Sequence, residues 1–233
     1  MKKSLLLLAL AAASFSASAQ TKATPKAATT QAAPAGYPDM LAATIKSVMS
    51  TGDPAELKNL AGTLERAATV APADWLPRYY QAYALMINVF QSKEEDDQKD
   101  KTLDQAEAAL AQARKLGGEE SELLVLQAYL YQARLGISPM MRSMKYSSMV
   151  TEAVAKAKKI NPANPRIYLV QANNAYYTPK MFGGGAEVAK PLYEEAKTKF
   201  AAFKPSSALA PNWGERQVLG RLKAYETASA TVN

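Results

Sequence analysis

The sequence predicts an all-α fold built from stacked helical hairpins. In residues 150–175, two apolar stripes with helical spacing are joined by the turn NPANP at residues 161–165. Pro162 ends the first stripe, Asn164 is a good N-cap, and Pro165 suits the first position of the next helix. None of the periodic segments alternates apolar and polar residues over the length of a strand, so no sheet is expected.

An internal repeat supports the same fold. Two alanines lie 15 residues apart in three copies, and in each copy apolar residues precede the first alanine by seven and three positions. The pairs are Ala67 and Ala82, Ala113 and Ala128, and Ala157 and Ala172, and a fourth copy of the first half ends at Ala196. The recurrence predicts that each copy is one helical hairpin and that successive hairpins stack.

At these residues the chain resembles the tetratricopeptide-repeat (TPR) family. It resembles a TPR-like helical-repeat protein of the bacterial cell envelope. The matching features are small residues such as Ala172 on the first helix, the run Ala189-x3-Tyr193-x2-Ala196 on the second, and a closing proline such as Pro162. The resemblance implies a right-handed repeat of about four hairpins plus a C-terminal capping helix. The repeat is longer than the usual ~34 residues, and the surplus is expected in the loop inside each hairpin.

The N-terminus is predicted to be a targeting segment. Residues 1–19 combine a basic start (Lys2 and Lys3), an apolar run too short to span a bilayer, and a cleavage site at Ala17-Ser18-Ala19. No cysteine follows the site, so no lipid anchor is expected. Residues 20–36, rich in alanine, threonine and proline, are predicted to be a disordered linker. The mature chain is expected in the periplasm or outside the cell, and loss of Lys2 and Lys3 lowers its formal charge from +7 to +5.

Start and stop signals place the helices of the predicted domain, residues 37–233. Asp53, Pro54 and Glu56 supply an N-cap, a first-position proline and a capping-box acid. Asp74 caps the following helix. The predicted helices are 38–50, 54–70, one after Asp74, 102–116, 119–135, two flanking the turn at 161–165, one around Ala189, and a capping helix from Trp213 to about Ala228. Trp213 is expected to be a packing anchor.

Three insertions within the hairpins are predicted to be loops. The first is acidic but lacks the spacing of a calcium loop, and the third is glycine-rich but lacks the Gly-Lys-Ser/Thr of a phosphate loop. A solvated loop and a tight reversal with Phe182 against the core are therefore the preferred interpretations. Met140 and Met141 are expected to fill core gaps rather than touch a partner, and Pro191 predicts a late start or a kink in its helix. The three insertions are residues 92–101, 136–143 and 178–185.

The composition argues against an enzyme. The chain has no histidine and no cysteine, which removes the commonest general base, the commonest zinc ligand and any thiol nucleophile. Adjacent carboxylates such as Glu119 and Glu120 point in different directions on a helix, so they do not converge for acid–base work. We predict no catalytic residues, no cofactor and no metal.

The predicted function is a protein-interaction scaffold that binds another protein or a peptide segment. By resemblance to TPR proteins, the contacts come from a groove lined by the first helix of each hairpin. We expect Tyr83 and Tyr129, which follow the marker alanines, to face the same bound segment; packing between helices is an equally weighted alternative for each tyrosine. The candidate groove residues are Tyr79, Tyr83, Met86, Val125, Tyr129, Gln132, Arg166, Leu169, Asn173 and Tyr176.

A second function stays open from the sequence. Lysines and tyrosines on a mildly basic surface are also compatible with binding an envelope glycan or another anionic polymer. The charge is too dilute to indicate nucleic acid, and no segment of the sequence is long and apolar enough to span a membrane.

Overall fold

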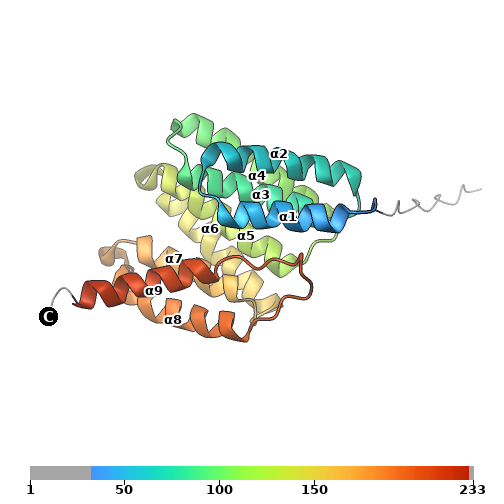
Figure 1. Cartoon of the computed structure of the whole chain (residues 1–233). Coiled ribbons are helices and arrows are strands. Elements are labelled where there is room, and N and C mark those ends of the chain that lie inside the picture. Colours follow the sequence, from blue (N-terminus) through green and yellow to red (C-terminus); the bar gives the residue numbers. More distant parts are fainter. Residues whose placement is uncertain (1–32, 231–233) are drawn as a thin grey trace, which may run out of the picture. The chain divides into compact units, whose positions relative to one another are not determined.

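The structure is a computed structural model that describes residues 33–230, with side chains to residue 228. These residues form nine α-helices and no strand, which confirms the predicted all-α class (Figure 1). The predicted signal peptide and most of the predicted linker lie outside the described residues. The helices are α1 Tyr37–Ser50, α2 Pro54–Val70, α3 Leu76–Gln91, α4 Asp96–Lys115, α5 Glu120–Ile137, α6 Pro139–Ile160, α7 Pro165–Tyr177, α8 Ala186–Ala202 and α9 Glu215–Ala230, with a short 3₁₀ helix at Lys180–Phe182.

The helices pack in consecutive pairs. Helix α1 packs with α2, α3 with α4, α5 with α6, and α7 with α8, while the first helices of neighbouring pairs also touch. Helix α9 packs on α8 and follows the last pair. Four pairs and a final helix agree with the predicted order of elements; the right-handed TPR geometry itself stays a prediction. Within residues 33–230, no helix combines the length and apolar character that crossing a bilayer requires.

The marker alanines lie where helices approach closely. Each is at most 2% exposed, as expected for small residues at helix contacts, and the set is Ala67, Ala82, Ala113, Ala128, Ala157, Ala172 and Ala196. The helical register predicted from these alanines is therefore confirmed.

A matched pair of substitutions on α6 tests this register. Ala157→Glu should lower the free energy of unfolding by about 3 kcal/mol or more, because it places a carboxylate in a fully buried position. Ala155→Glu makes the same change at an exposed position of the same helix and should stay within about 0.5 kcal/mol of the native protein. Urea denaturation of both variants measures the difference, and equal midpoints would show that the register is shifted.

The first predicted loop is largely helical. Helix α4 begins at Asp96, so the loop predicted over residues 92–101 is wrong beyond Glu95. Asp96 and Asp97 lie in the first turn, where the partial positive charge of the helix end favours carboxylates. Thr102, the first residue of the predicted helix 102–116, lies inside α4 and donates a hydrogen bond to the Gln98 carbonyl oxygen at 3.0 Å.

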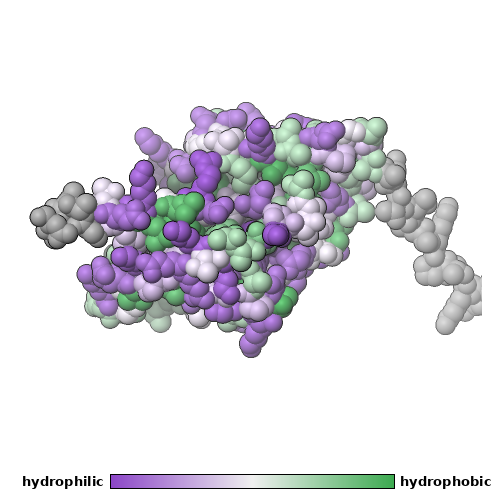
Figure 2. Space-filling view, turned by 60° about the horizontal axis from the view of Figure 1, so that its bottom comes forward, coloured by the Kyte–Doolittle hydropathy of each residue, from purple (hydrophilic) through white to green (hydrophobic). Residues whose placement is uncertain are grey.

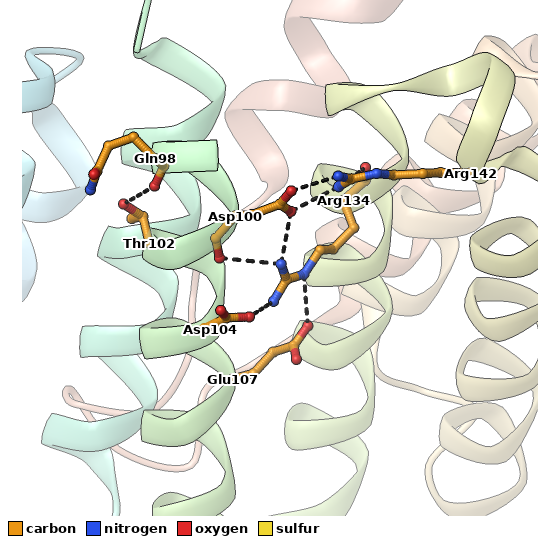
Figure 3. A network of polar contacts seen from close by, with 7 residues as sticks. All are labelled: Gln98, Asp100, Thr102, Asp104, Glu107, Arg134 and Arg142. Carbon is orange, nitrogen blue, oxygen red and sulfur yellow. Dashed lines mark hydrogen bonds and ion pairs between the residues drawn. The ribbon is translucent and has the colours of Figure 1, made fainter. Parts of the chain in front are cut away.

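An ion-pair network holds this extension of α4 against α5. The buried guanidinium of Arg134 on α5 contacts carboxylates on three successive turns of α4: Asp100 at 2.8 Å, Asp104, and Glu107 at 3.3 Å (Figure 3). Arg142 on α6 donates hydrogen bonds to both carboxylate oxygens of Asp100. The hydrogen bonds from Arg142 and then Arg134 lower the pKa of Asp100, so its carboxylate stays ionised. These contacts explain why the acidic run is ordered as helix.

The second predicted loop, residues 136–143, is also mostly helical. Helix α5 ends at Ile137 and α6 begins at Pro139, so only Ser138 separates the two helices. Met140 and Met141 are 95% and 85% exposed. The expectation that they fill gaps in the core is therefore wrong; they project from the first turn of α6 into solvent.

The third insertion, residues 178–185, is a real loop that contains the 3₁₀ helix. Phe182 is 71% exposed, so the expected packing of this ring on the core is wrong. Helix α8 begins at Ala186 and continues through Pro191; the predicted late start is wrong. Helix α9 begins at Glu215, two residues after Trp213, because Gly214 supplies the carbonyl that accepts the first helical hydrogen bonds.

Candidate binding site on the A-helix face

The residues predicted to line a groove lie on α3, α5 and α7, and the face that these helices form is here called the A-helix face. Figure 1 shows α1 and α9 on the near side of these helices. Of the ten candidate groove residues, all of which lie on these three helices, Gln132, Asn173 and Tyr176 are partly exposed. The other seven are buried, and they are Tyr79, Tyr83, Met86, Val125, Tyr129, Arg166 and Leu169.

The chain's own C-terminal segment, residues 203–214 between α8 and α9, covers the centre of the A-helix face. Trp213, 3% exposed, donates a hydrogen bond from Nε1 to the Tyr79 hydroxyl at 2.8 Å. Its ring centroid lies 5.0 Å from that of Tyr83 and 5.6 Å from that of Tyr129. Trp213 is thus a packing anchor, as predicted. Tyr83 and Tyr129 do face one segment, and that segment belongs to the same chain.

A buried ion pair lies beneath this segment. Arg166, fully buried, donates from Nε to Glu122 Oε2 at 2.8 Å and from Nη2 to Glu122 Oε1. Asn164 and Tyr79 donate further hydrogen bonds to the same carboxylate, at 2.9 and 3.2 Å. Phe203 stacks on the guanidinium, with the ring centroid 4.6 Å from Cζ. Burial, and then the nearby Glu122 carboxylate, raise the pKa of Tyr79, which keeps its hydroxyl protonated.

The partly exposed candidates make contacts within the stack. Gln132 donates from Nε2 to the Val170 carbonyl oxygen at 2.7 Å, which joins α5 to α7. Asn173 accepts a hydrogen bond from the Tyr193 hydroxyl at 2.6 Å, which joins α7 to α8. These side chains therefore have structural partners, and their predicted role in binding a partner stays a prediction.

One end of the A-helix face exposes aromatic side chains beside a cation. The aromatic cluster consists of Phe90, Tyr129, Tyr176, Tyr177 and Arg221, contributed by α3, α5, α7 and α9. Phe90 is 43% exposed and Tyr177 is 67% exposed. The ring centroids of Phe90 and Tyr129 are 5.3 Å apart, and those of Tyr176 and Tyr177 are 5.0 Å apart.

Arg221 is the member of the cluster that α9 contributes, and it contacts the two tyrosines of α7. Its Nη2 donates a hydrogen bond to the Tyr177 hydroxyl at 3.1 Å, and its Cζ lies 4.1 Å from the ring centroid of Tyr176. Tyr129 donates from its hydroxyl to Gln217 Oε1 of α9 at 2.9 Å. Burial, and then the neighbouring Tyr177, raise the pKa of Tyr129, so it is a neutral phenol at neutral pH.

The cluster offers two kinds of contact to a ligand. Phe90 and Tyr177 are exposed aromatic rings, and aromatic faces bind flat apolar molecules. Arg221 places a planar guanidinium beside Tyr177, a group that binds carboxylates well. Figure 2 shows that hydrophobic patches on one side of the molecule are small and separated by polar side chains. No group of three or more His, Cys, Asp or Glu residues suited to a metal ion lies in the described part of the chain.

The sequence indicated only part of this cluster. Tyr129 and Tyr176 are among the predicted groove residues, whereas Phe90, Tyr177 and Arg221 are not. Arg221 follows Tyr177 by 44 residues and belongs to the helix that was expected only to cap the stack. No local pattern in the sequence relates the two.

Comparison with known proteins gives a family. No family model matches the chain, and no curated protein sequence matches it. Among solved structures, the chain is similar to the HusA haemophore from Porphyromonas gingivalis, with 35% sequence identity and a TM-score of 0.73. The similarity covers 82% of this chain and 94% of that chain. At this identity over nearly the whole of the solved structure, the chain belongs to the family of the HusA haemophore.

Proposed function

We propose that the protein is a non-enzymatic binding protein for haem or a closely related tetrapyrrole, and that the aromatic cluster contacts this ligand. The relative is named a haemophore, a protein that carries haem. The observation that carries the location is the exposed ring of Tyr177 beside the guanidinium of Arg221, together with the exposed ring of Phe90 against Tyr129.

The chemistry of haem matches these groups. Haem is a flat apolar macrocycle that carries two carboxylates on one edge. The exposed rings of Phe90 and Tyr177 suit its faces, and Arg221 suits a carboxylate because a guanidinium forms paired charge-assisted hydrogen bonds. With no histidine or cysteine in the chain, contacts to the ring faces and carboxylates carry the proposed recognition.

The two functions predicted from the sequence stay predictions. Trp213 is hydrogen-bonded to Tyr79 and packs on the rings of Tyr83 and Tyr129. A peptide in the centre of the A-helix face would have to displace it. No contact of the described residues favours an anionic polymer over haem. A signal peptide at residues 1–19, if cleaved as predicted, places the proposed capture of haem outside the cytoplasm.

Haem titration of the mature chain tests the proposal. We expect saturable binding with a shifted Soret band and quenched tryptophan fluorescence, because Trp213 lies 5.6 Å from Tyr129 of the cluster. Phe90→Ala with Tyr177→Ala should weaken haem binding by about tenfold or more, since truncating aromatic contacts at an interface commonly costs ~2 kcal/mol. Arg221→Gln should also weaken binding, and its effect should shrink at high salt.

Two variants control for the loss of exposed apolar surface. Leu116→Ala and Ile160→Ala truncate exposed residues at the C-terminal ends of α4 and α6, away from the cluster, and should bind haem like the native chain. Circular dichroism should show the same helix content for all variants. Native affinity in the Phe90/Tyr177 variant would exclude the aromatic cluster as the site, and absence of haem binding by the native chain would refute the proposed function.

A further inference from the structure

Three exposed methionines stand together at the start of α6. Met140, Met141 and Met144 are 95%, 85% and 93% exposed, the highest values among the large hydrophobic residues of residues 33–228. The segment from residue 140 to 149 holds four of the nine methionines in the chain. Its strongly exposed apolar residues are all methionine, although leucine, isoleucine or phenylalanine serves equally well for plain apolar contact. The exclusive use of methionine indicates that the sulfur atom, and not only the apolar surface, has a role at this segment.

The helix brings the three side chains within reach of one another. Met140 and Met144 are four residues apart and Met141 and Met144 are three apart, spacings at which Cβ atoms on a helix lie about 5–6 Å apart. Methionine has three rotatable bonds and is unbranched, so its sulfur can be turned toward a shared point. Because no packing holds these side chains, a bound ion can set their conformation.

Two cationic residues, Arg142 and Lys145, neighbour the patch. Arg142 lies within the same turn, but its guanidinium is held by Asp100 of α4, with Nη1–Oδ1 at 2.8 Å and Nη2–Oδ2 at 2.5 Å (Figure 3). Lys145 places its ammonium 5.3 Å from the ring centroid of Tyr146. The ligands that the three methionines offer are neutral thioethers, and no group of three or more Asp or Glu suited to calcium, magnesium or zinc lies in the described residues.

We propose that Met140, Met141 and Met144 bind one soft monovalent cation of the Cu(I) type. Thioether sulfur is a soft ligand that selects Cu(I) over the harder divalent metals. The partial positive charge of the α6 N-terminus opposes a cation, but at an exposed site this opposition is weak and screened by salt. Thioethers carry no proton at any physiological pH, so binding releases none and the affinity should not change between pH 5 and 8.

Silver(I) is a redox-inert probe for this site. Titration of the mature chain with Ag(I), followed by NMR of ¹³C-methyl methionine, should shift the methyl signals of Met140, Met141 and Met144 together and saturate at one equivalent. Met181, 83% exposed on the α7–α8 loop, is the internal reference and should not shift with them. Competition with a chromogenic Cu(I) chelator should give the same stoichiometry for Cu(I) under anaerobic conditions.

Leucine substitutions separate sulfur ligation from apolar contact. Met140→Leu, Met141→Leu and Met144→Leu together keep the apolar surface and remove the sulfur atoms, so Ag(I) and Cu(I) affinity should fall at least tenfold. Met181→Leu should leave both affinities unchanged. Binding that survives the triple substitution, uptake without joint saturation of the three signals, or the pH dependence of a carboxylate site would overturn the proposal. Haem titration of the triple variant should be unchanged, which keeps this result independent of the proposed haem site.

Discussion

Glu122→Gln should lower the free energy of unfolding by about 3–5 kcal/mol, because it leaves the guanidinium of Arg166 buried without a counter-charge. Arg166 is fully buried and Glu122 is 5% exposed. The lost carboxylate also accepts hydrogen bonds from Tyr79 and Asn164, which join α3 and α7 to α5. Urea denaturation monitored by circular dichroism measures the change.

A double variant separates the cost of an orphaned charge from the contribution of the pair. Glu122→Leu with Arg166→Met replaces both ions by apolar groups, and buried pairs replaced in this way often lose little stability. We expect the double variant to be more stable than Glu122→Gln. A loss below about 1 kcal/mol for Glu122→Gln would show that water reaches this ion pair, contrary to its burial.

Trp213→Ala should also cost about 3–5 kcal/mol, the range for truncation of a large buried aromatic side chain. The substitution removes the contacts with Tyr83 and Tyr129 and the hydrogen bond to Tyr79. It should also release the C-terminal segment from the A-helix face. Hydrogen exchange should then be faster in residues 203–218 than in α5.

Trp213→Phe is the matched control for this prediction. Phenylalanine keeps most of the aromatic contact and removes the indole donor, so the cost should be about 1–2 kcal/mol smaller than for alanine. Unchanged stability and exchange in Trp213→Ala would show that the segment does not depend on this side chain for docking.

The fold was predictable because helical hairpins have local signals. Caps and first-position prolines mark the helix starts, as at Asp53, Pro54 and Asn164, where the structure shows the expected side-chain caps or helix starts. The repeated alanines mark close contacts between helices. The loop predicted at residues 92–101 is helical from Asp96. The sequence did not reveal this because an acidic run is equally typical of a solvated loop and of a helix N-terminus. Its order depends on Arg134, more than 30 residues away.

The candidate site was less predictable because its parts come from distant segments. Tyr83 and Tyr129 were expected to meet a partner, and a sequence does not reveal that Trp213 reaches them from 84 or more residues away. The double substitution Tyr83→Ala and Tyr129→Ala is consequently expected to destabilise the fold as well as to affect binding. Phe90, Tyr177 and Arg221 belong to three helices far apart in the sequence, and only tertiary contacts relate them: Phe90 packs on Tyr129 of α5, and Arg221 of α9 binds Tyr177.

The docking of the C-terminal segment has a consequence for how the chain folds. In a simple stack each hairpin touches its neighbours, so hairpins at the ends can unzip one at a time. Here Tyr80 bonds to Leu209 and Tyr79 to Trp213, contacts that span 129 and 134 residues. Closing such long loops slows folding, because the entropy of the intervening chain is lost before the contact forms. The same contacts join Leu209 and Trp213 to α3 of the second hairpin. The stack should therefore melt as one cooperative unit, and a chain that ends before Trp213 should unfold in steps.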